Sequence, residues 1–227
     1  MKKLMIAIFV ATAIVSCKKQ AKEEIQPKTP KEAITKELSI DYASIGMDTT
    51  SIPRGLNVGD NAPEITFTTA ENKKETLASY YQKQPVVIIF YRGYWCPVCN
   101  KHLTEFAQKA KEIEAAGAKL IAITSESYDN VAKTKKQTGA NFTIISDADG
   151  SIRKSFDVNF KVTEDYQAMI QDKLKASIAK TNANKQAELP VPATFIIDKS
   201  GKIVYKQFNP DYKVRASVED ILNNLPK

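Results

Sequence analysis

Blocks of apolar residues alternate with charged, helix-patterned blocks along most of the chain. The run at 85–92, PVVIIFYR, is continuously apolar and rich in β-branched residues, and so is most of the run at 118–125, AKLIAITS. Both runs predict strands that are buried on both faces. Between them, residues 97–116 have the charged composition of a surface helix, which Gly117 would end.

The same reading predicts the remaining elements. We expect helices at 128–139, 151–158 and 214–225, a helical or irregular segment at 76–84, a short strand at 64–69, a strand and turn at 142–150, and a hairpin at 193–208. Strands that alternate with helices favour parallel pairing through right-handed crossovers, whereas the final hairpin adds antiparallel pairing. The predicted fold class is therefore α/β, with a central mixed β-sheet flanked by helices.

Residues 163–187 form one longer helical stretch in this interpretation. Its apolar side chains recur every four residues, at Tyr166, Ile170, Leu174 and Ile178. That spacing predicts an amphipathic helix packed on the domain. A lid or a partner surface is the alternative, because the segment ends just before Pro192.

The N-terminus has the pattern of a targeting segment. Residues 1–16 combine a basic start with an apolar run that is too short to span a bilayer, which predicts a signal peptide, with a transmembrane anchor as the alternative. The run ends in Ile-Val-Ser-Cys17, which resembles a bacterial lipoprotein signal and implies lipidation of Cys17. Residues 17–55 would then be a lipid-anchored tether and N-terminal extension, and residues 56–227 the main domain. The expected location is the bacterial cell envelope, anchored to a membrane and facing the periplasm or the cell exterior.

Composition and charge add few constraints. Apolar residues make up 43% and charged residues 26% of the chain, as in an ordinary soluble domain. The formal net charge is +7, but Lys and Glu are interleaved and no basic stripe with interleaved aromatic residues is present. We therefore expect no nucleic-acid partner.

The stretch YRGYWCPVC, at 91–99, carries the candidate chemistry. It places Cys96 where the predicted strand meets the predicted helix, and the unpaired N–H groups and positive dipole end of a helix N-terminus lower a thiol pKa. Cys99 lies one turn further on, close enough to form a disulfide with Cys96 after one thiol has attacked a substrate. Pro97 suits the first helical turn, and Trp95 would cover the site and restrict its hydration.

Two other uses of this dithiol are less favoured. A structural zinc site needs four ligands, whereas the chain has only Cys17 and His102 to add to the pair. A structural disulfide would close a very short loop and remove little chain entropy. A redox dithiol without a metal or an organic cofactor remains the favoured interpretation.

FYRGYWCPVC on a strand-to-helix turn resembles the active site of the thioredoxin superfamily. LNVGDNAPEITF, LIAITSESYDNVAKTKKQTGANFTIISDADGSIRKSFDV and VPATFIIDKSGKIVYKQF resemble, in order, the opening, central and closing parts of peroxiredoxins of the alkyl hydroperoxide reductase/thiol-specific antioxidant family. The resemblance covers roughly residues 57–225. It implies a thioredoxin-like fold with an N-terminal extension and a helical insertion before the loop at Pro192, where thioredoxins usually have a cis proline.

The resemblance also has departures. Peroxiredoxins carry a Pro and a Thr or Ser where this chain has Ile89 and Gly93, and an Arg where it has Pro192. The activated role carries over to Cys96 and the resolving role to Cys99, whereas the catalytic Thr and Arg do not carry over. Two roles stay open for Arg92: an ion pair with a surface carboxylate, or substitution for the missing Arg, where its charge would stabilise the Cys96 thiolate and polarise a peroxide.

Neighbouring side chains have mainly structural interpretations. His102, one turn after Cys99, is expected to be a solvated helical residue, with a proton shuttle as the alternative. Tyr91 and Tyr94 are expected to be packing residues, with a hydroxyl that lines the pocket as the alternative.

The resemblance implies that Cys96 reduces a peroxide, becomes a sulfenic acid and is resolved by Cys99. A thioredoxin-like or membrane-linked dithiol would then recycle the disulfide. The alternative is a thiol–disulfide oxidoreductase that reduces protein disulfides in the envelope, which the CxxC spacing and Pro192 favour. A copper chaperone of the cytochrome oxidase assembly type is disfavoured, because that family spaces its cysteines CxxxC and adds a distant His.

Overall fold

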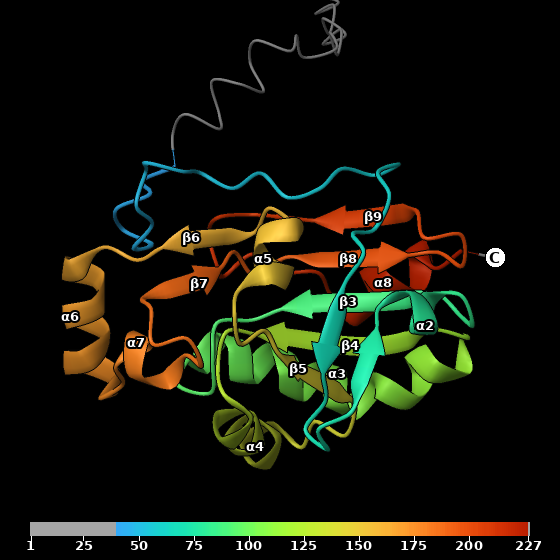
Figure 1. The fold of residues 1–227 in the computed structure, drawn as a ribbon, viewed down its shortest axis with the longest axis horizontal. Helices are drawn as coiled ribbons and strands as arrows, with labels where there is room; N and C mark the ends of the chain where they lie inside the picture. Colours follow the sequence, from blue (N-terminus) through green and yellow to red (C-terminus); the bar gives the residue numbers. More distant parts are fainter. Residues whose placement is uncertain (1–39, 227) are drawn as a thin grey trace, which may run out of the picture. The chain divides into compact units, whose positions relative to one another are not determined.

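A five-stranded mixed sheet forms the centre of the molecule in the computed structural model, which describes residues 40–226 (Figure 1). Its strand order is β5-β4-β3-β8-β9. Strand β3 pairs in parallel with β4 and antiparallel with β8, while β4–β5 is parallel and β8–β9 antiparallel. The strands are β3 (Val86–Phe90), β4 (Lys119–Thr124), β5 (Thr143–Ser146), β8 (Thr194–Ile197) and β9 (Ile203–Gln207). The prediction of a mixed sheet with parallel crossovers and a terminal antiparallel hairpin is confirmed.

Helices cover both faces of this sheet. The longest is α3 (Pro97–Ala115), which contacts α4 (Tyr128–Thr138) and α8 (Val218–Asn224). Figure 1 shows α3 and α8 behind the sheet and the short α5 (Ser151–Ser155) in front of it. A separate hairpin of β1 (Thr66–Thr68) and β2 (Lys74–Thr76) precedes the short α2 (Ala78–Tyr81). The layered α/β arrangement follows from strands that must bury both faces.

Local chemistry explains where these elements lie. All five residues of β3 are buried, as its continuous apolar run predicted. Helix α4 ends at Gly139, which adopts the left-handed conformation with φ 72°. Helix α8 starts at Val218 rather than at 214, because Ser217 and Asp220 form a reciprocal capping box there.

The prediction of one long helix at 163–187 is wrong. The segment forms α6 (Glu164–Leu174), α7 (Ile178–Thr181) and β7 (Glu188–Pro190), and β7 pairs with β6 (Asn159–Lys161). Lys175 takes a left-handed conformation and ends α6, and the Ser177 side chain then caps a new helix. The four-residue repeat runs through this break, so Tyr166, Ile170 and Ile178 are buried while Leu174 is 36% exposed.

The compact domain begins before the boundary expected near residue 56. The compact unit starts at Ile40. Ile45 and Met47 join the hydrophobic core, and Met47 forms a bridge with Val162. Residues 40–55, expected to belong to the tether, therefore pack on the domain because their apolar side chains find a core to enter. The predicted signal peptide at 1–16 and Cys17 lie outside the described residues.

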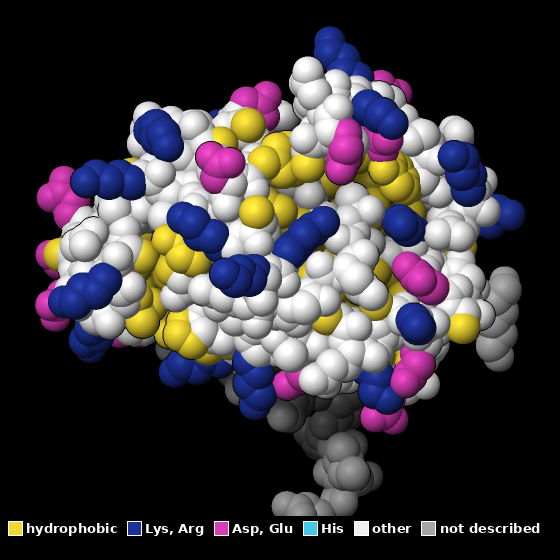
Figure 2. All heavy atoms as spheres, turned by 90° about the horizontal axis from the view of Figure 1, so that it is seen from below, with side chains coloured by type: hydrophobic (Ala, Val, Ile, Leu, Met, Phe, Trp, Pro, Cys, Tyr) yellow, Lys and Arg dark blue, Asp and Glu magenta, His cyan; other side chains and the backbone are white. Residues whose placement is uncertain are grey.

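No helix among residues 40–226 is long and apolar enough to cross a membrane. On the face in Figure 2, Lys and Arg side chains lie among Asp and Glu side chains and apolar atoms. The interleaving of charges along the sequence is therefore also visible on this surface.

Candidate active site

The dithiol lies where β3 ends and α3 begins, as the sequence predicted. Cys96 is the N-cap of α3, with extended backbone angles, and Pro97 follows as the first helical residue. The Cys96 sulfur accepts the backbone N–H of Cys99 over 3.2 Å. Cys96 therefore stands where a helix N-terminus offers N–H groups to a negative charge. Both thiols are reduced and buried.

Arg92 is buried beside the first cysteine. Its Nη2 donates to Cys96 Sγ over 3.3 Å, and its Nη1 donates to the hydroxyl of Tyr166 over 2.7 Å. The guanidinium lies over the ring of Tyr212, 3.6 Å from its centroid, and 5.4 Å from the ring of Trp95. The guanidinium is therefore held in one position by a phenol, a thiol and an aromatic face, and its interpretation as the partner of a surface carboxylate does not fit this geometry.

A second arginine, Arg215, contacts the second cysteine. Its Nη2 donates to Cys99 Sγ over 3.3 Å, while its Nε donates to the carbonyl of Tyr212 over 2.6 Å. The irregular segment between β9 and α8 thus supplies both the ring under Arg92 and the cation at Cys99. Each sulfur consequently has a guanidinium of its own.

The two thiols titrate as a pair. Burial raises the pKa of the Cys96 thiol, and the nearby Cys99 raises it further, against the opposing effect of Arg92. Burial also opposes ionisation of Cys99, but the hydrogen bond from Cys96 and the cation of Arg215 outweigh it and lower the pKa of Cys99. Because a second thiolate beside the first is costly, ionisation of one thiol opposes ionisation of the other, and the two guanidinium groups favour a single negative charge on the pair.

A carboxyl lies beneath the loop that leads to the dithiol. Glu126 follows β4 and has no exposed surface, and its Oε2 accepts the backbone N–H of Tyr94 over 2.8 Å. A Cβ at Gly93 would lie 2.6 Å from Glu126 Oε1 and 2.5 Å from Trp95 Nε1, so only glycine fits there. Burial is the main cause that raises the pKa of Glu126 to about 8. At the position where peroxiredoxins carry Thr or Ser, this chain has Gly93, and the carboxyl of Glu126 occupies the space that a side chain there would need.

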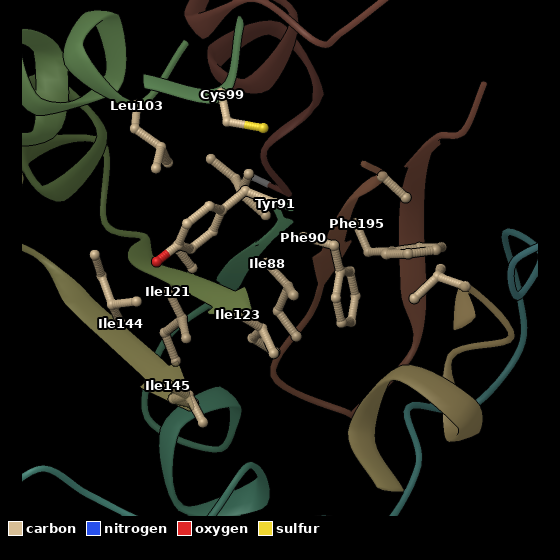
Figure 3. Close-up of a cluster of buried hydrophobic side chains, with 14 of the residues drawn as sticks. Ile88, Phe90, Tyr91, Cys99, Leu103, Ile121, Ile123, Ile144, Ile145 and Phe195 are labelled. Carbon is tan, nitrogen blue, oxygen red and sulfur yellow. The ribbon is translucent and has the colours of Figure 1, made fainter. Parts of the chain in front are cut away.

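Trp95 is 6% exposed and belongs to the core, as a covering residue would. The hydroxyl of Tyr91 donates to Thr134 Oγ1 over 3.3 Å, and Figure 3 shows Tyr91 in the core on the same side as Leu103 and Cys99. Lys133 lies over the ring of Tyr94, 4.8 Å from its centroid. The two tyrosines therefore act as packing residues.

The prediction of a solvated His102 is wrong. The ring is 6% exposed and packs edge-on against Phe106. Its Nε2 lies 2.8 Å from the carbonyl oxygen of Ala216, so Nε2 is the protonated nitrogen. Burial lowers the pKa of His102. The histidine faces inward because the segment before α8 covers this side of α3.

Pro192 lies at the expected end of the sheet. The β3–β8 pairing aligns Ile89 with Thr194, and Phe90 N–H donates to the carbonyl of Ala193, so the register places Pro192 opposite Tyr91. The expected cis bond is absent, because no peptide bond among residues 40–226 is cis. The chain runs extended from β7, where Val191 N–H still donates to Val158, directly into β8, which suits a trans bond.

A groove of about 510 Å³ opens beside the second cysteine. The start of α3 forms one wall, and the segment before α8, with Arg215, forms the other. The residues between and after the two cysteines, Pro97, Val98, Lys101 and His102, line it. Arg215, which donates to Cys99 Sγ, is thus part of the groove wall, while both sulfurs are buried behind it.

Sequence reasoning missed several residues of the site: Glu126, Tyr166 as a partner of Arg92, Tyr212 and Arg215. Glu126 had a detectable signal, because it directly follows a predicted parallel strand and the carboxyl ends of neighbouring parallel strands share one edge. Tyr212 and Arg215 had none, since they lie in an irregular segment far from the CxxC in sequence.

Comparisons with known proteins identify the family and the fold. The model of the AhpC/TSA family matches residues 58–206. Peroxiredoxin Q from chloroplasts of Oryza sativa subsp. japonica is 25% identical over 173 residues, 75% of this chain and 68% of that protein. The thiol–disulfide oxidoreductase ResA of Bacillus thuringiensis is 24% identical over 150 residues, 66% of this chain and 68% of that protein. The crystal structure of the peroxidoxin BcpB from Mycobacterium tuberculosis superposes with a TM-score of 0.57 at 20% identity, covering 74% of this chain and 96% of that one.

Proposed function

This chain belongs to the AhpC/TSA family, and on that premise we propose that it is a thiol peroxidase in which Cys96 attacks the peroxide and Cys99 resolves the product. The observation that carries the proposal is the hydrogen bond from Arg92 to Cys96 Sγ, in a site where the same guanidinium also holds the hydroxyl of Tyr166. A cation and a hydroxyl next to a buried thiol are the groups that polarise a peroxide.

The first step transfers one oxygen atom. The proton of the Cys96 thiol first passes to Cys99, so that the negative charge of the pair lies on Cys96. The Cys96 thiolate then attacks one peroxide oxygen, the S–O bond forms and the O–O bond breaks. The alkoxide that leaves takes the proton of the Cys99 thiol, so that the products are an alcohol, or water from hydrogen peroxide, and a sulfenic acid beside a Cys99 thiolate. Arg92 supports this step, because its charge stabilises the anions that form beside it.

Tyr166 and Arg92 together offer groups that the residues at 93 and 192 lack. Gly93 has no hydroxyl, but the guanidinium of Arg92 donates hydrogen bonds both to the phenol of Tyr166 and to Cys96 Sγ. Pro192 has no cation, but Arg92 is held over Tyr212 at the same end of the sheet. The proposed peroxide site is therefore assembled from the dithiol loop and the helical insertion.

Rapid mixing of the reduced full-length protein with hydrogen peroxide tests the proposal. The fluorescence of Trp95, the single tryptophan, reports the reaction. We expect oxidation much faster than that of a free cysteine, no reaction in Cys96→Ser, and a trappable sulfenic acid on Cys96 in Cys99→Ser. Substitution of Arg92 by Gln should slow the first step by at least about tenfold, or 1.4 kcal/mol of activation free energy. Oxidation as slow as that of a free thiol, with hydrogen peroxide and with organic peroxides, would exclude a peroxidase.

Reduction of protein disulfides is the second candidate function. It is favoured by the adjacent placement of both thiols at one helix N-terminus and by the groove beside Cys99 and Arg215. The likeness to the oxidoreductase ResA is a further argument. A direct comparison of the oxidation rates of the reduced protein by peroxide and by a disulfide-bonded protein separates the two functions.

For the cell, we infer a lipid-anchored protein of the bacterial envelope. The supporting observation is the apolar run that ends at Cys17. A thioredoxin-like or membrane-linked dithiol would regenerate the reduced enzyme. Mass spectrometry of the purified protein should show acylation at Cys17, and Cys17→Ser should leave the membrane fraction; an unmodified Cys17 would exclude the anchor.

A further inference from the structure

Glu126 is a buried carboxyl that the steps above do not use. It has 0% exposure, and only one of its oxygens has a hydrogen-bond partner among the described residues, the N–H of Tyr94. The other oxygen, Oε1, lies against Gly93, three residues before Cys96, where any side chain would collide with it. An unpaired buried oxygen is costly, so its retention beside a reactive dithiol points to a role in proton transfer.

Several groups that titrate or donate hydrogen bonds face this carboxyl from the surrounding elements. Cys99 on α3 and Tyr91 after β3 interact with it electrostatically, and both lie in buried surroundings. Lys133 on α4 provides the opposing cation, and the Thr181 hydroxyl on α7, which donates to the carbonyl of Ile178, also favours the ionised carboxyl. After burial, the anionic form of Cys99 is the largest of the influences that keep the carboxyl protonated.

We propose that Glu126 gives up a proton when the dithiol is oxidised and regains it when the dithiol is reduced, so that the buried site carries one negative charge in both redox states. The inference rests on the proposed function, in which Cys96 and Cys99 form a disulfide. It assigns Glu126 as the proton carrier of the resolving step.

The resolving step then balances. The Cys99 thiolate attacks the sulfur of the Cys96 sulfenic acid, the S–S bond forms and the S–O bond breaks, and hydroxide leaves with the electrons of that bond. Glu126 donates its proton to the hydroxide, which becomes water, and the negative charge moves from Cys99 to the carboxylate. An external dithiol later supplies two electrons and two protons, which restore one thiol, one thiolate and the neutral Glu126.

The two arginines explain why a constant charge is favourable. In the reduced site, Arg92 and Arg215 each donate to a sulfur, and the dithiol anion lies between these cations. A disulfide has no charge, so oxidation alone would leave both guanidinium groups without their anion in a poorly solvated site. Ionisation of Glu126 replaces that anion, because the loss of the Cys99 thiolate removes the repulsion that kept the carboxyl neutral.

The test is the pH dependence of the dithiol–disulfide equilibrium in the full-length protein, titrated against a small dithiol without peroxide. Between pH 6 and 8 the wild type should take up one more proton on reduction than Glu126→Gln. The two reduction equilibria should therefore diverge tenfold per pH unit, about 30 mV per pH unit for a two-electron couple. Glu105→Gln, which removes an exposed carboxyl on α3, should behave like the wild type. Equal slopes for wild type and Glu126→Gln would overturn the proposal.

A second measurement uses the wild-type protein alone and so does not depend on whether a variant folds. The infrared difference spectrum between the reduced and oxidised wild type at pH 7.5 should show a protonated carboxyl in the reduced state and its loss on oxidation. An unchanged carboxyl would contradict the proposal. Because neither experiment uses a peroxide, a protein that fails as a peroxidase but shows the extra proton would disprove the proposed function alone.

Discussion

The hydroxyl of Tyr166 accepts a hydrogen bond from Nη1 of Arg92 over 2.7 Å, and this contact ties helix α6 to the dithiol loop. The ring of Tyr166 packs directly on Gly46, where a side chain would collide with it. The side chain of Tyr166 therefore links three segments that are far apart in sequence: the dithiol loop, α6 and the turn at Gly46. Helix α6 is part of the site and not only a packing element.

Removal of this hydroxyl should weaken the site without disturbing the packing. In Tyr166→Phe the ring stays against Gly46, but Nη1 of the buried Arg92 loses its acceptor, which costs about 1–3 kcal/mol. We expect the rate of Cys96 oxidation by peroxide to fall by about tenfold, measured by stopped-flow fluorescence. Tyr205→Phe on β9 is the control. Equal rates for Tyr166→Phe and the wild type would show that Arg92 does not need Tyr166.

Substitution of Arg215 should affect the second cysteine and not the first. Arg215→Gln removes the cation that lowers the pKa of Cys99, so less Cys99 is thiolate at neutral pH. Formation of the disulfide from the sulfenic acid should slow down by about threefold for each unit by which the pKa of Cys99 rises, and it should recover as the pH is raised. Lys213→Gln, in the same segment but exposed, should leave this step unchanged. If the sulfenic acid of Arg215→Gln formed slowly but was resolved at the normal rate, the prediction that Arg215 acts on Cys99 would be wrong.

Gly93 should tolerate no side chain. In Gly93→Ala the new methyl group meets Trp95 Nε1 and Glu126 Oε1, and the loop before Cys96 must move, at about 1–3 kcal/mol of unfolding free energy. Gly117→Ala is the matched control, since its Cβ meets no atom within 4 Å and only its positive φ is strained. Urea unfolding measures stability in both. The reactivity of Cys96 should change in Gly93→Ala only, and an unchanged reactivity there would mean that the loop accommodates the methyl group.

Stability of the reduced protein should fall as the pH rises from about 5 to 8. Burial raises the pKa of Glu126 to about 8 in the folded protein, above the usual value of 4.5, so the folded state binds its proton more tightly than the unfolded state. The contribution of protonated Glu126 to the free energy of unfolding is complete below pH 4.5. It declines by up to about 1.4 kcal/mol per pH unit above that pH and is lost above pH 8. Urea unfolding across this range should show the decline in the wild type and in Glu105→Gln. The same decline in Glu126→Gln would assign it to another group.

The sequence by itself determined the architecture and the reactive pair. The continuous apolar runs at β3 and β4 are short and rich in β-branched residues, which predicts strands buried on both faces. The CxxC at the junction of β3 and α3 follows from the same pattern, since Pro97 and the charged run after it start a helix there. These features depend on local spacing, which one stretch of chain contains in full.

Only the tertiary structure decided what surrounds the two sulfurs. Arg215 and Tyr212 come from an irregular segment, and Glu126 comes from the loop that follows β4. Tyr166 comes from an insertion whose break at Lys175 is hidden by the four-residue apolar repeat. The repeat was misleading because the second helix continues the buried face after a left-handed residue. His102 was misjudged because an amphipathic pattern does not show which later segment covers a helix. Charges and hydroxyls act over a few ångströms in space, and separation along the chain does not encode that distance.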